Sequence, residues 1–204
     1  MEVAKSIGKV VDIGGFLPQS GISAVQTLRP HHKGEAGPNQ YSGAFGLGDF
    51  PLHTDLAHWA RPPRYFLLRC RRGSPAVMTR LLATSVLASA VGRETLERAL
   101  VRPRRPQPNG MHSLLPIVLP GGDTLAVRWD SLFLVPMNEA ARRISEIMMK
   151  DAWCQSDLTS IALKQVGDIL ILDNWCVLHG RSSIVCEPDC DRWLERVYIS
   201  ELHP

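Results

Sequence analysis

The sequence lacks the features that mark several large classes of protein. No apolar run approaches the roughly 20 residues that a membrane-spanning helix needs, and residues 1–6 lack the apolar core of a signal peptide. Lysine and arginine barely exceed aspartate and glutamate, 23 against 20, so charge gives little indication of a nucleic-acid partner. The one dense basic cluster, at residues 102–106, is interrupted by prolines and is most simply a solvated loop. We therefore expect a soluble, cytoplasmic protein that binds neither a membrane nor a nucleic acid.

Cysteine is too scarce and too irregular to organise the fold. The five cysteines form no CxxC pair. Cys186 and Cys190 could form a disulfide or half of a zinc site, but no second close pair completes a tetrahedral site. Free thiols in a reducing compartment are the simpler interpretation. Since 204 residues can bury a full core without such cross-links, we expect a single domain over residues 1–204.

Short apolar segments bounded by turn residues predict a mainly β protein with flanking helices. Apolar residues at helical spacing predict helices over residues 81–90, 94–101 and 138–150. The turn at 120–123 predicts a hairpin between strands at 113–119 and 124–129. Further strands are expected at residues 9–13, 64–70, 76–79, 158–163, 168–173, 175–179 and 192–200. This order is typical of a β-barrel or sandwich with helices packed outside it.

The composition of residues 17–49 predicts a segment that is mostly loop. Glycine or proline occurs at positions 18, 21, 30, 34, 37, 38, 43, 46 and 48, which interrupts any regular period. Loops of this length are often lids or binding loops. Because the segment leads directly to His53, we predict that residues 17–49 form an active-site wall or lid, with a plain surface loop as the alternative.

Three residues have the composition of a metal site. His53 and Asp55 are two apart, so on an extended segment both side chains point to the same side. His179, far downstream, would supply a third ligand. Two histidines and one carboxylate form the facial triad of non-haem Fe(II) oxygenases, which leaves three metal positions open. Zinc hydrolases use the same residue types, so the triad alone leaves both chemistries possible.

Two arginines follow on a predicted strand. Arg192 and Arg196 would share one face of it, about 13 Å apart at about 3.3 Å per residue. Arginine is rarely buried without a partner, so two arginines facing a barrel interior would require anions. The alternative is that both face solvent.

The sequence around these residues resembles a known family. The run His53-Thr54-Asp55 is followed by two prolines, and residues 167–181 match the pattern Gly-Asp-x-Leu-x-x-Asp-Asn-x-x-x-x-His-Gly-Arg. These motifs are similar to those of the TauD/TfdA-like, clavaminate synthase-like oxygenases. The resemblance covers mainly residues 50–65 and 165–200. It implies a double-stranded β-helix (a jelly roll, or cupin-like barrel), Fe(II) held by His53, Asp55 and His179, and 2-oxoglutarate and O2 as cosubstrates.

The resemblance also implies roles for other residues. Arg192 would bind the far carboxylate of 2-oxoglutarate, which suits a permanently charged, bidentate guanidinium. Thr79 would assist it, although the usual Gly-Gly-Asp-Thr is absent here. Arg196 would contact the substrate or help to hold the cosubstrate, and Arg181 would tie down the loop after His179. From position alone, further candidates for substrate contact are Asn39, Tyr41 and Arg128.

Three functions follow from these residues. The first is an Fe(II)- and 2-oxoglutarate-dependent dioxygenase that oxidises a C–H bond of a small molecule, an amino acid, a derivative of one or another small anion, and releases succinate and CO2. The second is a hydroxylase or demethylase of a macromolecule, which the modest charge disfavours. The third is a jelly-roll metal-binding protein or zinc enzyme without oxygenase activity, since a fold does not fix a function. Arg192 discriminates, because an outward orientation would favour the third. The substrate and the oligomeric state stay open.

Overall fold

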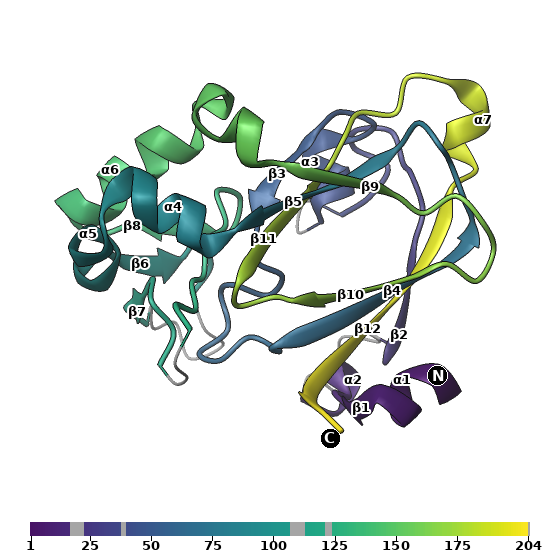
Figure 1. The fold of residues 1–204 in the computed structure, drawn as a ribbon, viewed down its shortest axis with the longest axis horizontal. Helices are drawn as coiled ribbons and strands as arrows, with labels where there is room; N and C mark the ends of the chain where they lie inside the picture. Colours follow the sequence, from purple (N-terminus) through teal and green to yellow (C-terminus); the bar gives the residue numbers. More distant parts are fainter. Residues whose placement is uncertain (17–22, 38–39, 107–112, 121–123, 204) are drawn as a thin grey trace.

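Two antiparallel sheets form the body of the protein. The computed structural model describes residues 1–16, 23–37, 40–106, 113–120 and 124–203. One sheet has the order β1-β12-β4-β10, with β2 also pairing to β12; its strands are β1 (Gly8–Val10), β2 (Val25–Leu28), β4 (Tyr65–Arg72), β10 (Ile169–Asp173) and β12 (Trp193–Leu202). The other has the order β3-β11-β5-β9, from β3 (Phe50–His53), β5 (Met78–Ala83), β9 (Thr159–Ala162) and β11 (Val177–Arg181). The two sheets lie one above the other in Figure 1.

The chain between β5 and β9 forms a separate layer at one end of the sandwich (Figure 1). It contains α4 (Thr84–Val91), α5 (Arg93–Arg98), α6 (Glu139–Met148), the 3-10 helix η2 (Asp151–Asp157) and a small sheet of order β7-β6-β8, from β6 (Leu100–Pro103), β7 (Leu115–Pro116) and β8 (Leu134–Pro136). The largest hydrophobic cluster packs these helices against the small sheet, with Leu87, Leu96, Ile117 and Ile144 fully buried. The remaining helices are α1 (Glu2–Ile7), α2 (Ile13–Phe16), α3 (Tyr41–Phe45) and α7 (Glu187–Cys190). Among the described residues, no helix is long and apolar enough to cross a membrane.

The start of the long motif has a structural explanation. Gly167 has φ +96°, a conformation that other residues rarely adopt. Asp168 then accepts hydrogen bonds from the backbone N–H groups of Lys164 and Gln165 at 2.8 and 2.9 Å. This turn begins β10, which pairs along its full length with β4. The Gly-Asp pair therefore sets the register of the strand that leads to the candidate metal site.

Several boundaries differ from the sequence predictions. The helix predicted from residue 81 begins at Thr84, because Leu81 and Leu82 pair with β11. The helix predicted to end at 101 stops at Arg98, since the following residues form β6. In the predicted hairpin, the two segments pair through one bridge between Val118 and Val127, and residues 121–123 of its turn lie outside the described residues. β7, in the first segment, pairs with β6 instead.

The prediction that residues 17–49 are mostly loop misses two short elements in the described part of that range. Residues 25–28 form β2 because they pair with β12, with Gln26 opposite Arg196. Residues 41–45 form α3, where Tyr41 and Phe45 pack against Phe50. Tertiary contacts thus order a sequence whose glycines and prolines predicted none.

Candidate metal centre

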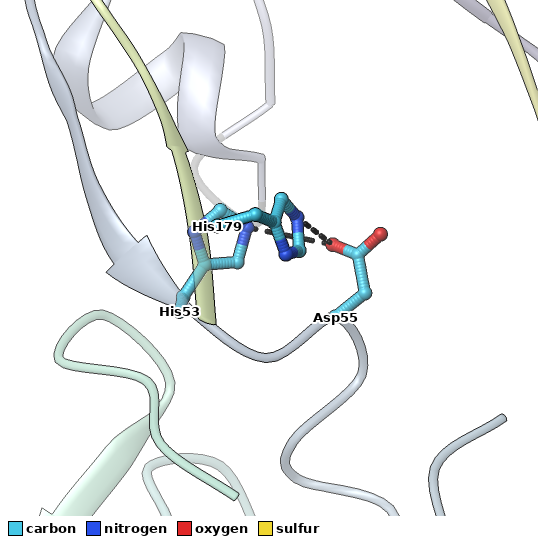
Figure 2. A group of neighbouring side chains, drawn as sticks. All are labelled: His53, Asp55 and His179. Atoms are coloured by element: carbon cyan, nitrogen blue, oxygen red, sulfur yellow. Dashed lines mark ion pairs between the residues drawn. The ribbon is translucent and has the colours of Figure 1, made fainter. Parts of the chain in front are cut away.

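His53, Asp55 and His179 converge on one point, although His179 lies far from the other two in the sequence (Figure 2). His53 ends β3 and is paired directly with His179 of β11, so the two rings lie 4.3 Å apart between centroids. Oδ1 of Asp55 lies 3.4 Å from Nε2 of His53 and 3.6 Å from Nε2 of His179. All three side chains are buried.

The donor atoms are oriented for a metal ion. Nδ1 of His53 lies 2.9 Å from the carbonyl oxygen of Pro51, and donation of its proton there leaves the Nε2 lone pair facing Asp55. Burial, and then the nearby His53, lower the pKa of His179 to about 4, so its imidazole is neutral near pH 7. Burial opposes protonation of His53, but the adjacent Asp55 raises its pKa overall. A carboxylate and two imidazoles in their neutral form fit Fe(II) as a facial triad.

The second carboxylate oxygen of Asp55 is held from β12. Nη1 of Arg196 donates to Oδ2 at 2.7 Å, and the Tyr198 hydroxyl donates to the same oxygen at 3.1 Å. Burial alone would raise the pKa of Asp55, but the charge of Arg196, together with hydrogen bonds from His179 and His53, holds it well below its usual range. Asp55 is therefore an ionised carboxylate with Oδ1 left for the histidine side. Sequence reasoning missed the role of Tyr198.

The backbone around Asp55 is clamped by Asn174, which directly follows β10 and is fully buried. Its side-chain oxygen accepts the Asp55 N–H at 2.8 Å, and its amide nitrogen donates to the carbonyl oxygens of Asp55 at 3.0 Å and Pro63 at 2.9 Å. This is the Asn of the Asp-Asn pair in the motif. The motif was visible in the sequence, but the partner of Asn174 was not, because it lies over a hundred residues away.

A cavity of about 1690 Å³ is lined by the triad together with Arg192 and Thr79. Thr79 lies on β5 and is buried in the cavity wall. Arg192 is only 8% exposed, yet its side chain has no hydrogen bond or ion pair with another described residue, and its Nε is buried without a partner. Burial lowers its pKa to about 10, so it remains charged near neutral pH. Arg192 is thus a buried cation that faces a cavity and lacks an anion.

Comparison with known proteins now bears on this site. Residues 149–198 match the model of the taurine catabolism dioxygenase TauD, TfdA family. The predicted resemblance to that family is confirmed. The chain is also 26% identical over 167 residues to clavaminate synthase 2 of Streptomyces clavuligerus. The matched region covers 72% of this chain and 49% of that protein.

Two solved structures have the same jelly-roll fold. An asparagine oxygenase in complex with Fe(II), 2S,3S-3-hydroxyasparagine and succinate aligns with a TM-score of 0.70 and 20% identity, over 95% of this chain and 60% of that one. A D157A mutant of the non-heme iron oxygenase OrfP, in complex with (3S)-hydroxy-L-Arg, aligns with a TM-score of 0.69 and 22% identity, over 98% and 63%. The predicted fold class is thereby confirmed. The chain spans about half to three fifths of the length of these relatives.

The other predicted site residues of this TauD/TfdA-like chain have different surroundings. Arg196 lines the cavity, but its guanidinium is engaged by Asp55 and by Oε1 of Gln26, at 3.2 Å from Nε and 2.6 Å from Nη2. Tyr41 lines the cavity and stacks on the ring of His53, with centroids 4.0 Å apart. Asn39 lies outside the described residues.

Arg128 does not line the cavity, contrary to the prediction. It is 1% exposed, and its terminal nitrogens donate to the carbonyl oxygens of Ala57 at 3.0 Å, of Ala60 at 2.8 Å and of Trp59. It therefore fixes the loop that follows the His-x-Asp motif. Its backbone N–H donates to the carbonyl oxygen of Ile117 at 2.8 Å.

Arg181 supports the segment that precedes β3. Its Nη2 donates to the carbonyl oxygens of Gly46 at 2.9 Å and Gly48 at 2.7 Å, and its guanidinium lies 3.7 Å from the ring centre of Phe50. A weaker bond from Nε reaches Ser182, in the loop that the sequence predicted it to hold. Arg181 thus anchors the wall that carries Tyr41 more than the loop after His179.

Proposed function

We propose that this protein is an Fe(II)- and 2-oxoglutarate-dependent dioxygenase that oxidises a C–H bond of a small molecule. The observation that carries the proposal is Arg192: a buried guanidinium without a partner among the described residues, lining the same cavity as a His, Asp, His cluster. A metal site explains the cluster, and an anionic cosubstrate explains the arginine.

In this proposal His53, Asp55 and His179 hold the iron and leave three positions open for 2-oxoglutarate and O2. When bound, the metal supplies O2 activation coupled to conversion of 2-oxoglutarate to succinate and CO2. Arg192 binds the distal carboxylate of 2-oxoglutarate, with the Thr79 hydroxyl as a second donor. The protein contributes position: Arg196 and Tyr198 keep one oxygen of Asp55 occupied, so the other stays directed toward the histidines.

The proposed substrate is an amino acid or a derivative of one. The asparagine oxygenase and OrfP structures hold hydroxylated amino acids, and the former also holds succinate. The inward position of Arg192 disfavours a zinc enzyme without a 2-oxo acid, because that chemistry gives the arginine no anion. The cavity lining also includes Arg29, Arg61, Arg64, Arg104 and Arg105, so a larger anionic substrate, nucleic acid included, is the second candidate.

Anaerobic titration tests the proposal. The apo-protein is given Fe(II) and then 2-oxoglutarate, and the weak visible charge-transfer band of the chelated 2-oxo acid is followed. We expect the band in the wild type. In Arg192→Ala we expect a requirement for 2-oxoglutarate about 10-fold to 100-fold higher, since a hydrogen-bonded charge is lost. Arg61→Ala is the matched control, because Arg61 also lines the cavity but is exposed and stacks on Trp175.

Two outcomes would count against it. Iron that binds without a band on addition of 2-oxoglutarate would show that the triad serves other chemistry. A band with unchanged 2-oxoglutarate affinity in Arg192→Ala would keep the oxygenase and remove Arg192 from the cosubstrate site.

A further inference from the structure

The direction of the Arg192 side chain depends on where its backbone lies. The guanidinium has no hydrogen bond or ion pair with another described residue, so no protein group holds its tip. Arg192 ends the connection between β11 and β12, which also contains α7 and lies at the end of the sandwich away from the helical layer (Figure 1). Whatever fixes this connection therefore fixes the arginine.

The connection has one buried anchor near the arginine. From Val185 to Asp191, a stretch that the structure describes in full, only Asp189 is buried, at 9% exposure. Its carbonyl oxygen accepts the backbone N–H of Arg192 at 3.1 Å. A shift of Asp189 would therefore carry Arg192 with it.

The carboxylate of Asp189 is held by Ser74, a residue of the turn between β4 and β5. Ser74 is 1% exposed, and its hydroxyl donates to Oδ1 of Asp189 at 2.6 Å, although 115 residues separate the two in the sequence. Asp189 has no ion pair among the described residues, so this hydrogen bond is its side-chain tether. We call these two residues the Ser74–Asp189 pair.

The same hydroxyl shapes the turn that leads to Thr79. Its oxygen accepts the backbone N–H groups of Ala76 at 3.2 Å and Val77 at 3.1 Å, directly before β5. Thr79 is the second residue of that strand. The Ser74–Asp189 pair thus joins the two segments that carry the proposed cosubstrate residues.

The turn that carries Ser74 is also fixed from another side. The Ser74 N–H donates to the carbonyl oxygen of Leu163 at 3.2 Å. Gly73 lies so close to the Lys164 backbone that a Cβ at this position would collide with it. The pair therefore ties the connection before β12 to a closely packed part of the sandwich.

We propose that Ser74 and Asp189 are positioning residues, which hold Arg192 in place to bind the distal carboxylate of 2-oxoglutarate. Neither residue lines the cavity, so both act through Arg192 and not by contact with the cosubstrate. Two parallel hydrogen bonds to a carboxylate require a defined direction of the guanidinium, and a displacement of about 1 Å weakens them. This inference rests on the proposed function, because Arg192 is the proposed cosubstrate residue.

Two 2-oxo acids that differ only at the far end test the inference. 2-Oxopentanoate has a methyl group where 2-oxoglutarate has its distal carboxylate, so both can chelate the iron but only one can use Arg192. Under anaerobic conditions with Fe(II), the charge-transfer band gives the dissociation constant of each acid. We expect the wild type to bind 2-oxoglutarate about 10-fold to 100-fold more tightly, the range of a hydrogen-bonded charge.

Removing either member of the pair should lower this preference. In Ser74→Ala and in Asp189→Ala we expect the ratio of the two dissociation constants to fall about threefold to tenfold, since the guanidinium is no longer held in direction. The affinity for 2-oxopentanoate should stay within about twofold of the wild type, because the iron end is distant from the change. The double variant should lose no more than the single variants, because the two residues act as one unit. Either single variant suffices if the other does not fold.

Two further variants separate position from charge. Asp189→Asn keeps an oxygen that can accept from Ser74, and should keep the ratio within about twofold of the wild type. Asp191→Asn is the control, since it removes a charge next to Arg192 but breaks only an ion pair with Arg72, in which the side chains are 2.8 Å apart and 60% and 62% exposed. Exposed ion pairs contribute little, so the ratio should again stay within about twofold.

The inference fails if Ser74→Ala and Asp189→Ala keep the preference of the wild type, or if both acids weaken together, which would show that the pair only stabilises the fold. It also fails if Asp189→Asn loses as much as Asp189→Ala, because the charge of Asp189 would then act on the cosubstrate directly. The proposed function fails separately, in the wild type itself, by the absence of the band or by equal binding of the two acids.

Discussion

Two buried arginines of this protein have opposite surroundings. Arg128 and Arg192 are 1% and 8% exposed, and burial lowers the pKa of each to about 10. The terminal nitrogens of Arg128 donate to three carbonyl oxygens of residues 57–60. The side chain of Arg192 has no hydrogen bond or ion pair within the described chain, and it lines the cavity over the triad. The two arginines therefore share their burial and their lowered pKa, and they differ in the hydrogen-bond partners of their side chains.

This difference separates structural from functional charges. Nε is buried without a partner in both arginines, so the terminal nitrogens make the difference. A buried arginine whose terminal nitrogens are bonded stabilises the fold, whereas one without any side-chain hydrogen bond destabilises the empty protein until a ligand supplies the missing anion. Perturbed pKa values alone would have ranked Arg128 equal to Arg192.

The largest effect should come from Arg128→Met, which keeps the length of the side chain but leaves the carbonyl oxygens of Ala57, Trp59 and Ala60 without donors. We expect the free energy of unfolding to fall by about 3–5 kcal/mol, because several buried acceptors lose their partners at once. Urea denaturation measures this change. A loss within about 0.5 kcal/mol, the range of an ordinary surface substitution, would remove the structural role assigned to Arg128.

Arg192→Met should not share the loss of stability that we expect of Arg128→Met. We expect the stability of the ligand-free protein to stay the same or rise, since an unpaired buried charge is removed. In the wild type with Fe(II), 2-oxoglutarate at 100 times its dissociation constant should add about 2.7 kcal/mol. In the variant, the same concentration should add only about 0.4–1.4 kcal/mol, for binding that is about 100-fold to 10-fold weaker. Anaerobic thermal denaturation with and without 2-oxoglutarate tests both statements. Equal stabilisation of the two proteins would contradict the role of Arg192.

Arg192→Lys sharpens the comparison by keeping the charge and removing the fork of donors. We expect part of the stabilisation by 2-oxoglutarate to return, with binding about tenfold weaker than in the wild type, because an ammonium cannot make the bidentate contact. Full recovery would mean that charge alone matters at this position. No recovery would mean that the shape of the guanidinium decides binding.

The sequence predicted the parts of the site that local motifs encode. The spacing of His53 and Asp55 and the run ending in His179 placed all three residues correctly as neighbours, because each motif lies on a strand whose pairing brings it to the same point. The strands at 64–70, 168–173 and 192–200 and the helix at 138–150 were predicted within a few residues, since their apolar periods are regular. The fold class followed from these elements and from the resemblance.

What the sequence did not predict depends on contacts between distant segments. β2 forms in a sequence rich in glycine and proline because β12 offers an edge for pairing. Arg128 was predicted to contact the substrate, but its side chain is hydrogen-bonded to the loop of residues 57–60. Asn174 and Tyr198 have ordinary sequence environments, and their importance comes from the atoms they face. No local pattern encodes those partners.

The smallest predicted effect concerns an oxygen that is satisfied twice. Oδ2 of Asp55 accepts from both Arg196 and Tyr198, so Tyr198→Phe removes one donor and leaves the charged one. We expect iron affinity to fall only about threefold to tenfold, below the range of one hydrogen bond to a charged group, because Arg196 still donates to the same oxygen. Tyr65→Phe on neighbouring β4 is the control. Competition with a chelator measures the affinity. A loss far above tenfold would show that Tyr198 orients Asp55 more than Arg196 does. It would also show that the remaining bond from Arg196 does not compensate for the lost bond from Tyr198.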